Sequence, residues 1–298
     1  MHRISRRQFL QRSAGGAAAF AVGNPFSQNK NAIAAEERVD RVVLGRRGIE
    51  TSRLAFGTGS FGWELHSQQT DLGMKGFAKL LQQAYDHGVT FMDLADIYGS
   101  HRFFRNTLKF LPREKLTVLS KIWTRNTRWL QYQGFQPTFD RFRKETGCDY
   151  LDIVLIHCRE SANWEEEDAA LMDAMSEAKE CGDIRAVGVS CHTLDALKVA
   201  AKSEWVDVIL TRINNKGARM DGPPEAVMPV IKEAHDNGKG IVGMKIFGCG
   251  NLIEESQRNS SLRYVLGSGY VDAMTIGVDN IEHLRDNILR INATLASL

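Results

Sequence analysis

Four side chains that could act together on a carbonyl group lie where apolar stretches of the sequence end. Asp93 and Tyr98 occur in "MDLADIYG", Lys121 ends "KLTVLSK", and His157 ends "LDIVLIH". A phenol is a poor acid at neutral pH because its pKa is about 10. A nearby ammonium group stabilises the phenolate and lowers that pKa, and a carboxylate would hold the ammonium in place. With an imidazole to polarise the carbonyl oxygen, the set predicts general-acid chemistry on a carbonyl that receives hydride.

Taken singly, each of these residues has a simpler interpretation. A lone Asp, Lys or His at the end of a strand is more often a satisfied polar residue than a catalyst. A Tyr is commonly a packed aromatic residue with a solvated hydroxyl. The four residues therefore carry a functional prediction only if the fold brings them together.

Eight short apolar stretches, bounded by glycine and polar residues, follow one another along the chain. Near-continuous apolar stretches of this length are typical of strands buried on both faces of a sheet. The stretches are RLAFGTG from Arg53, VTFMDLA from Val89, KLTVLSK from Lys115, LDIVLIH from Leu151, IRAVGVS from Ile184, VDVILTRI from Val206, GIVGMKI from Gly240 and VDAMTIG from Val271.

Amphipathic segments separate these stretches, and the clearest of them end at Gly88, Gly182 and Gly238. Glycine is common just beyond a helix end, so these segments are predicted to be helices. Strand–helix alternation over roughly 250 residues predicts an α/β fold, a (β/α)8 TIM barrel, with its chemistry at the C-terminal strand ends. The alternative is a doubly wound sheet, but no GxGxxG motif follows the first stretch. The residues before Arg53 predict a short N-terminal β-hairpin.

"MDLADIYG", "LSK" and "LDIVLIH", in this order on a predicted eight-stranded barrel, resemble the aldo-keto reductase family. The resemblance runs from about Arg41 to the C-terminus and includes "IGVDNIEHLRDN", which is similar to the family's nucleotide-binding segment. It implies an oxidoreductase that transfers hydride between NADP or NAD and a small-molecule substrate, an aldehyde or ketone or the matching alcohol. It also implies that Tyr98 is the general acid, that Lys121 and Asp93 tune it, and that His157 orients the carbonyl.

The same resemblance implies where the cofactor binds. Ser190 matches the residue that contacts the nicotinamide carboxamide, and the glycines of "FGCGNL" match a loop near the pyrophosphate, where the backbone can approach closely. Asp286 and Asn287 stand where the family usually has Glu-Asn facing the adenine. The predicted cofactor-binding residues are Ser190, Cys191, Arg212, Asn214, Gly248, Gly250, Asp279, Asp286 and Asn287.

The sequence departs from the family pattern at several of these positions. Cys191 stands where members commonly have Asn, and Arg212 and Asn214 are candidates to replace the usual Gln and Tyr near the sixth strand. Asp279 falls near the expected position of the adenosine 2′-phosphate. A carboxylate there should repel a phosphate and suit a ribose hydroxyl, which predicts that NADH competes well with NADPH. The alternative is that Asp279 points to solvent.

The N-terminus carries a second resemblance. Ser5–Leu10, "SRRQFL", resembles the twin-arginine export signal of bacteria, and an Ala- and Gly-rich region follows from Ser13 to Val22. "AIA" at Ala32–Ala34 offers small residues to a signal peptidase. Such substrates cross the membrane already folded, often with a cofactor. The alternative is a basic N-terminus with no targeting role.

The resulting organisation is a signal peptide over residues 1–34, a linker over 35–40 and a barrel over 41–298. We expect cleavage near Ala34, an exported periplasmic protein, and the twin-arginine export machinery as a partner. No stretch of about 20 apolar residues lies beyond the N-terminus, so no stable membrane span is expected after cleavage.

Charge and cysteine content exclude other classes of function. The chain carries 38 Lys and Arg against 36 Asp and Glu, but five of the basic residues and none of the acidic ones lie in residues 1–34. The near-neutral remainder predicts no nucleic-acid partner. The five cysteines are odd in number and form no CxxC pair, so no metal site is predicted.

A second functional hypothesis is a catalytically weak nucleotide- or ligand-binding barrel with a regulatory role, because a fold does not imply a function. The four residues at the strand ends favour the enzyme. The altered nicotinamide contacts favour the binding protein.

Overall fold

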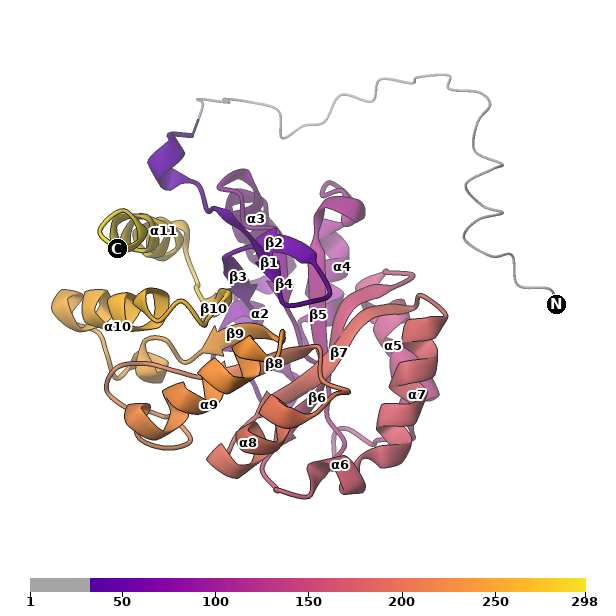
Figure 1. Cartoon of the computed structure of the whole chain (residues 1–298). Helices are drawn as coiled ribbons and strands as arrows, with labels where there is room; N and C mark the ends of the chain where they lie inside the picture. Colours follow the sequence, from indigo (N-terminus) through magenta and orange to yellow (C-terminus); the bar gives the residue numbers. More distant parts are fainter. Residues whose placement is uncertain (1–32) are drawn as a thin grey trace. The chain divides into compact units, whose positions relative to one another are not determined.

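The computed structural model describes residues 33–298 and shows a closed barrel of parallel strands (Figure 1). The barrel order is β10-β3-β4-β5-β6-β7-β8-β9, which confirms the predicted TIM barrel. The strands are β3 Leu54–Gly57, β4 Phe91–Asp93, β5 Thr117–Ile122, β6 Leu151–Arg159, β7 Ile184–Cys191, β8 Val208–Arg212, β9 Gly240–Met244 and β10 Ala273–Gly277. Residues 1–32, which carry most of the predicted export signal, lie outside the described residues.

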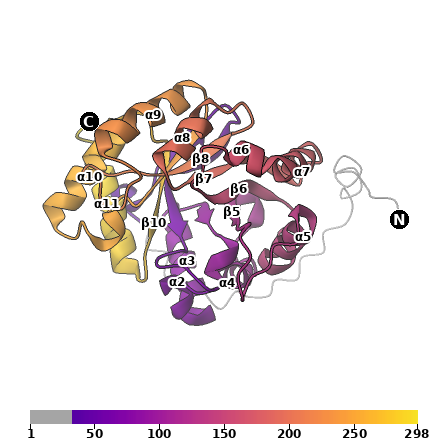
Figure 2. The same ribbon diagram turned by 90° about the horizontal axis from the view of Figure 1, so that it is seen from below.

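Helices surround the strands, as seen from below in Figure 2. The helices are α2 Gln68–Asp71, α3 Gly73–Asp86, α4 His101–Thr107, α5 Phe135–Thr146, α6 Trp164–Glu167, α7 Ala169–Glu180, α8 Leu194–Lys202, α9 Pro224–Asp236, α10 Glu255–Gly267 and α11 Ile281–Leu295. Short 3-10 turns occur at η1 Ala35–Glu37, η2 Asp96–Tyr98, η3 Arg113–Lys115 and η4 Gly248–Gly250. The segments predicted to end at Gly88, Gly182 and Gly238 are α3, α7 and α9, whose last helical residues lie two positions earlier.

A hairpin closes the N-terminal end of the barrel. Strands β1 (Arg41–Leu44) and β2 (Ile49–Ser52) pair antiparallel, and Leu44 faces Ile49 across the turn. Both side chains are buried and pack with Phe91 and Leu119 of the barrel interior. The predicted hairpin therefore covers the N-terminal end of the barrel core and serves as its floor.

The predicted linker is held against the last helix. Residues Ala35–Glu37 form the turn η1, and Asn292 of α11 donates its side-chain N–H groups to the carbonyl oxygens of Glu36 and Arg38. The chain that enters the barrel is thus fixed by hydrogen bonds before β1 begins.

Each barrel strand buries both of its faces, which explains the continuous apolar sequence. On β6, Ile153 and Leu155 belong to the core inside the barrel, and Val154 and Ile156 belong to the core between strands and helices. Side chains alternate between the two faces of a strand. The interior position that follows Leu155 is His157, so the alternation places this imidazole at the C-terminal mouth.

Candidate active site

Tyr98 ends the turn η2 after β4, and its ring lies against the loop that follows β3. A Cβ atom added at Gly59 or Gly62 would lie 2.4 Å from an atom of the Tyr98 ring. Only glycine allows the loop to approach the ring this closely. The two glycines therefore fix one face of the phenol.

Lys121 and Asp93 form a buried ion pair beneath Tyr98. The Nζ atom of Lys121 donates to Oδ1 of Asp93 and, at 2.9 Å, to the carbonyl oxygen of Leu94. The other carboxylate oxygen of Asp93 accepts from the Thr275 hydroxyl at 2.7 Å. The ammonium lies 4.9 Å from the centroid of the Tyr98 ring. These contacts hold the charge of Lys121 beside the phenol.

A bulge in β6 brings both His157 and Cys158 to the mouth. The register with β7 shifts between Ile156 and Arg159, and Cys158 has a φ of 60°, an unusual conformation for a residue other than glycine. The His157 ring lies edge-on to Tyr98, with the ring centroids 5.8 Å apart. The structure thus brings the four predicted residues to one place, while Cys158 is an addition that the sequence alternation does not predict.

The pKa values of the phenol and the imidazole shift in opposite directions. Burial raises the pKa of Tyr98 well above its ordinary value, and the carboxylates of Asp93 and Asp96 add to the rise. The sequence predicts that Lys121 lowers this pKa. The structure shows a rise instead, because burial raises the pKa and the Asp93 carboxylate offsets the charge of the ammonium group. Burial and the charge of Lys121 hold the pKa of His157 well below its ordinary value. The phenol is therefore protonated and the imidazole neutral.

A pocket of about 520 Å³ runs from Asp93 and Tyr98 to Asn287 on α11. Its wall carries the basic side chains of Lys245 and Arg258. A cationic wall of this kind suits an anionic ligand such as a phosphate group.

Gly250 and Asn287, two of the predicted cofactor-binding residues, line this pocket. Gly250 has a φ of 87°, and a Cβ atom there would meet nothing within 4 Å, so the backbone faces open space. Gly248 is buried beneath, where a Cβ would lie 2.8 Å from that of Ala218. The turn η4 thus presents bare backbone to the pocket.

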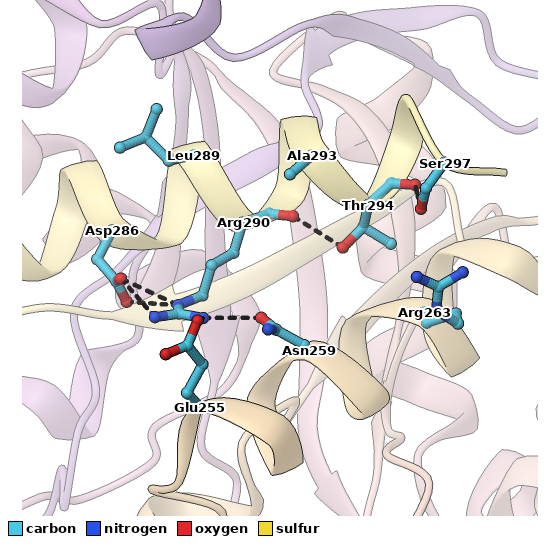
Figure 3. A pocket seen from close by; sticks show the side chains of 9 residues that line it. All are labelled: Glu255, Asn259, Arg263, Asp286, Leu289, Arg290, Ala293, Thr294 and Ser297. Atoms are coloured by element: carbon cyan, nitrogen blue, oxygen red, sulfur yellow. Dashed lines mark hydrogen bonds and ion pairs between the residues drawn. The ribbon is translucent and has the colours of Figure 1, made fainter.

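The side chain of Asp286 is not among those that line the 520 Å³ pocket. Its carboxylate accepts from Arg258 at 2.7 Å and from Arg290 at 2.9 Å. It lines a separate groove of about 400 Å³ between α10 and α11, with Arg290 and Glu255 (Figure 3). Its effect on the 520 Å³ pocket therefore comes through Arg258, which it holds in place. The structure thus places Asp286 on this groove and in contact with Arg258, and its adenine-facing role stays a prediction.

Asp279 lies close to the far end of the same pocket. Its side chain is 49% exposed, and Oδ1 lies 2.8 Å from Nδ1 of His283, which lines the pocket. The carboxylate therefore faces solvent and also contacts a residue that lines the pocket.

The residues predicted around the nicotinamide do not line this pocket. Ser190 faces the barrel interior and accepts from the backbone N–H of Cys158 at 3.3 Å. Cys191 is on the opposite face of β7 and is buried in the outer core, away from the mouth. Asn214 donates to the carbonyl oxygens of Ala218 and Lys245, and its own oxygen accepts two backbone N–H groups. The geometry gives Cys191 and Asn214 structural roles.

Arg212 takes part in a hydrogen-bonded chain at the mouth. Its guanidinium donates to Asp221 at 2.8 Å and to Nδ1 of His192 at 2.6 Å. The same nitrogen of His192 lies 3.1 Å from the Cys158 sulfur. The sequence places His192 at the end of the fifth strand, but nothing in its spacing indicates these partners.

Aromatic side chains cover the mouth beside Tyr98. Trp63 packs edge-on against Trp123 and Trp129, with ring centroids 5.4 and 5.2 Å away. Trp164 is fully buried and donates to the carbonyl oxygen of Ala196, so it anchors α6. Trp63 and Trp123 therefore lie at the mouth, since Trp123 also packs edge-on against His157.

Residues 33–298 contain neither a metal-binding cluster nor a membrane-spanning helix. Within them, no group of three or more His, Cys, Asp or Glu side chains is placed to hold a metal ion. In the same residues, every helix is too short or too polar to cross a membrane.

Comparison with known proteins places this site in a family. Residues 53–264 match the model of the Aldo/keto reductase family. A protein of Glycine max named "Probable aldo-keto reductase 1" is 26% identical over 247 residues, covering 76% of this chain and 66% of the relative, just under two thirds of its length.

Solved structures share the fold. The holo form of an aldo-keto reductase from Bacillus halodurans superposes with a TM-score of 0.69 at 16% identity, covering 87% of this chain and 96% of the other. An aldo/keto reductase from Klebsiella pneumoniae, in complex with NADP and acetate, superposes with a TM-score of 0.60 at 16% identity, covering 86% of this chain and 90% of the other. Together with the family model, which matches most of the sequence, these findings show that the chain belongs to the aldo/keto reductase family of oxidoreductases.

Proposed function

We propose that this chain is an NAD(P)-dependent oxidoreductase that transfers hydride between a nicotinamide cofactor and a small aldehyde or ketone, or the matching alcohol. The observation that carries the proposal is the convergence of Tyr98, Lys121, Asp93 and His157 at one end of a continuous pocket. The rest of that pocket has the charge and the open backbone that a nucleotide requires.

The pocket residues fit a dinucleotide. Lys245 and Arg258 would bind its phosphates, the bare backbone at Gly250 would allow close approach, and Asn287 would bind polar atoms at the far end. The cofactor, when bound, supplies the hydride. The NADP found in the Klebsiella pneumoniae structure belongs to that protein, and it supports the same class of ligand here.

Tyr98 would deliver the proton. Its raised pKa keeps the phenol protonated until the carbonyl oxygen becomes negative. Lys121, 4.9 Å from the ring centroid, would then stabilise the phenolate. His157 is neutral and would donate an N–H group to the same oxygen, which fixes the carbonyl in place.

Asp279 supports a cofactor preference. Its carboxylate contacts His283 on the pocket wall, where it would repel a nearby phosphate and accept from a ribose hydroxyl. We therefore propose that NADH competes well with NADPH. A binding titration that shows a strong preference for NADPH would contradict this.

We also propose that the protein is exported folded with its nucleotide, on the strength of the arginine pair in Ser5–Leu10. Protein recovered from the periplasm should release NAD or NADP in equal molar amount on denaturation. If the recovered protein carries none, the export of a loaded enzyme is contradicted.

The Tyr98→Phe variant tests the proposed catalytic role. Nucleotide binding, followed by the fluorescence of NADPH and NADH, should be retained, and aldehyde reduction should fall by about a hundredfold or more. Tyr85→Phe on α3 is the control, since this tyrosine packs against the outer core. Retained reduction by Tyr98→Phe would contradict the assignment, and nucleotide binding without turnover by the native protein would favour the regulatory barrel.

A further inference from the structure

A second imidazole lies at the mouth, beyond the four residues already described. Interior positions alternate along neighbouring strands, and they end in His157 on β6, in Ser190 and then His192 after β7, and in Arg212 on β8. The rings of His157 and His192 lie 6.3 Å apart between centroids, at 83° to one another. His192 therefore lies beside His157 at the C-terminal mouth of the barrel.

The contacts of His192 determine which of its nitrogens carries the proton. Arg212 lies 2.6 Å from Nδ1, and a guanidinium can only donate, so Nδ1 must accept. The Cys158 thiol, 3.1 Å from the same nitrogen, is then a second donor. The proton of the neutral ring is therefore on Nε2.

Arg212 is itself fixed. Its Nη1 atom donates to Asp221 at 2.8 Å, and the Asp221 side chain is 1% exposed. Burial, together with the charge of Arg212, holds the pKa of His192 at about 3. The ring thus stays neutral at ordinary pH, and it cannot act as a base toward Cys158. His192 can therefore act only as a hydrogen-bond donor, through an Nε2–H group of fixed orientation.

Nε2 of His192 has no hydrogen-bond partner within residues 33–298, and His192 is only half-buried. On His157 the Nδ1 atom is buried without a partner, and Nε2 has no hydrogen-bond partner in the same residues, so Nε2 is the nitrogen left for a ligand. Two neutral imidazoles, roughly perpendicular, thus each keep one ring nitrogen for a ligand. The reacting carbonyl oxygen needs a hydrogen bond from only one of these nitrogens, so the other is left for a second oxygen.

We propose that His192 is a substrate-positioning residue whose Nε2–H group binds a second oxygen, on the carbon next to the reacting carbonyl. The inference rests on the proposed function and deepens it. The preferred substrates are then 2-hydroxy aldehydes, 2-hydroxy ketones and 1,2-dicarbonyl compounds, and simple alkyl aldehydes are poorer. Arg212 and Asp221 act through His192, by fixing its tautomer.

Two aldehydes of the same size test the specificity. Glycolaldehyde and propanal differ by a hydroxyl in place of a methyl group, and the quantity measured is the ratio of their kcat/KM values. The ratio should favour glycolaldehyde and should fall about tenfold in His192→Phe, mainly through KM, because one neutral hydrogen bond is lost. His192→Gln keeps an N–H donor and should recover part of the ratio. His235→Phe on α9, outside the mouth, should leave it unchanged.

A spectroscopic measurement tests the tautomer independently of turnover. Nitrogen-15 NMR of histidine-labelled protein should show the His192 proton on Nε2, and Arg212→Met should produce a mixture. A proton on Nδ1 in the native protein would overturn the inference. So would a ratio that is unchanged in His192→Phe, with both aldehydes still reduced. If the native protein reduces other carbonyl compounds but neither of these aldehydes, this inference fails and the proposed function stands.

Discussion

The ammonium group of Lys121 lies 4.9 Å from the centroid of the Tyr98 ring, while its proton-donating bonds go to Asp93 and the Leu94 carbonyl. The lysine therefore acts on the phenol through its charge. Burial raises the pKa of the phenol and the Asp93 carboxylate adds to the rise, so the phenol stays protonated in the free protein. In the proposed mechanism, Tyr98 keeps this proton until the carbonyl oxygen accepts it.

The pH profile of carbonyl reduction follows from these two pKa values. Reduction needs Tyr98 protonated, and the raised pKa keeps it so as the pH rises. It needs His157 neutral, and the lowered pKa keeps it so as the pH falls. We expect kcat/KM to stay level from about pH 6 to about pH 9. An inflection at the ordinary histidine pKa would show that His157 is not held neutral.

Gly59→Ala should displace the catalytic phenol. The added methyl group would lie 2.4 Å from the Tyr98 ring, so the ring or the loop must move. A displacement of this order costs about a hundredfold in kcat. Gly222→Ala is the control, because its Cβ would meet its nearest atom at an ordinary 3.4 Å. Equal kcat values for the two variants, at equal thermal stability, would be inconsistent with a fixed ring.

Asp286→Asn should weaken nucleotide binding without removing a residue that lines the 520 Å³ pocket. The neutral amide would release Arg258, which loses its 2.7 Å ion pair and its fixed position. We expect the Kd for NADPH to rise about three- to tenfold, equivalent to about 1 kcal/mol. Titration by fluorescence measures it. Glu255→Gln, which contacts Arg290 in the same groove, is the matched control.

Asp279→Asn should shift the cofactor preference toward NADPH. The change removes the charge that would repel a 2′-phosphate and keeps a polar side chain beside His283. A half-exposed charge is strongly screened, so the expected shift in the ratio of Kd values is modest, about threefold. An unchanged ratio would mean that the carboxylate serves only His283 and solvent.

Leu44→Ala should destabilise the barrel from its closed end. Leu44 is fully buried beneath the interior core, and Val43 on the same strand is 53% exposed. We expect a loss of about 2–5 kcal/mol in the free energy of unfolding for Leu44→Ala. Val43→Ala should cost about 0.5 kcal/mol or less. Urea denaturation measures both, and similar losses would contradict the role of the hairpin as a floor.

The sequence predicts the strands because a parallel barrel buries both faces of each one. Leu151 to His157 is apolar almost throughout, and its alternation also places His157 at the mouth. The contacts around Cys158 were not predictable, since they depend on a bulge and a positive φ that no local pattern indicates. The partners of Asp286 and Asn214 are set by neighbouring elements, α10 and the loop after β8. The rise in the pKa of Tyr98 depends on enclosure, which appears only when the barrel closes.

Hydride transfer to a carbonyl can be followed directly by isotopic labelling. The purified protein would be mixed with NADH or NADPH deuterated at the reactive carbon, together with an aldehyde. The alcohol should carry deuterium on the former carbonyl carbon, found by mass spectrometry, and Tyr98→Phe should form it about a hundredfold or more slowly. If deuterated nucleotide binds and no alcohol acquires the label from any aldehyde or ketone supplied, hydride transfer by this protein is contradicted.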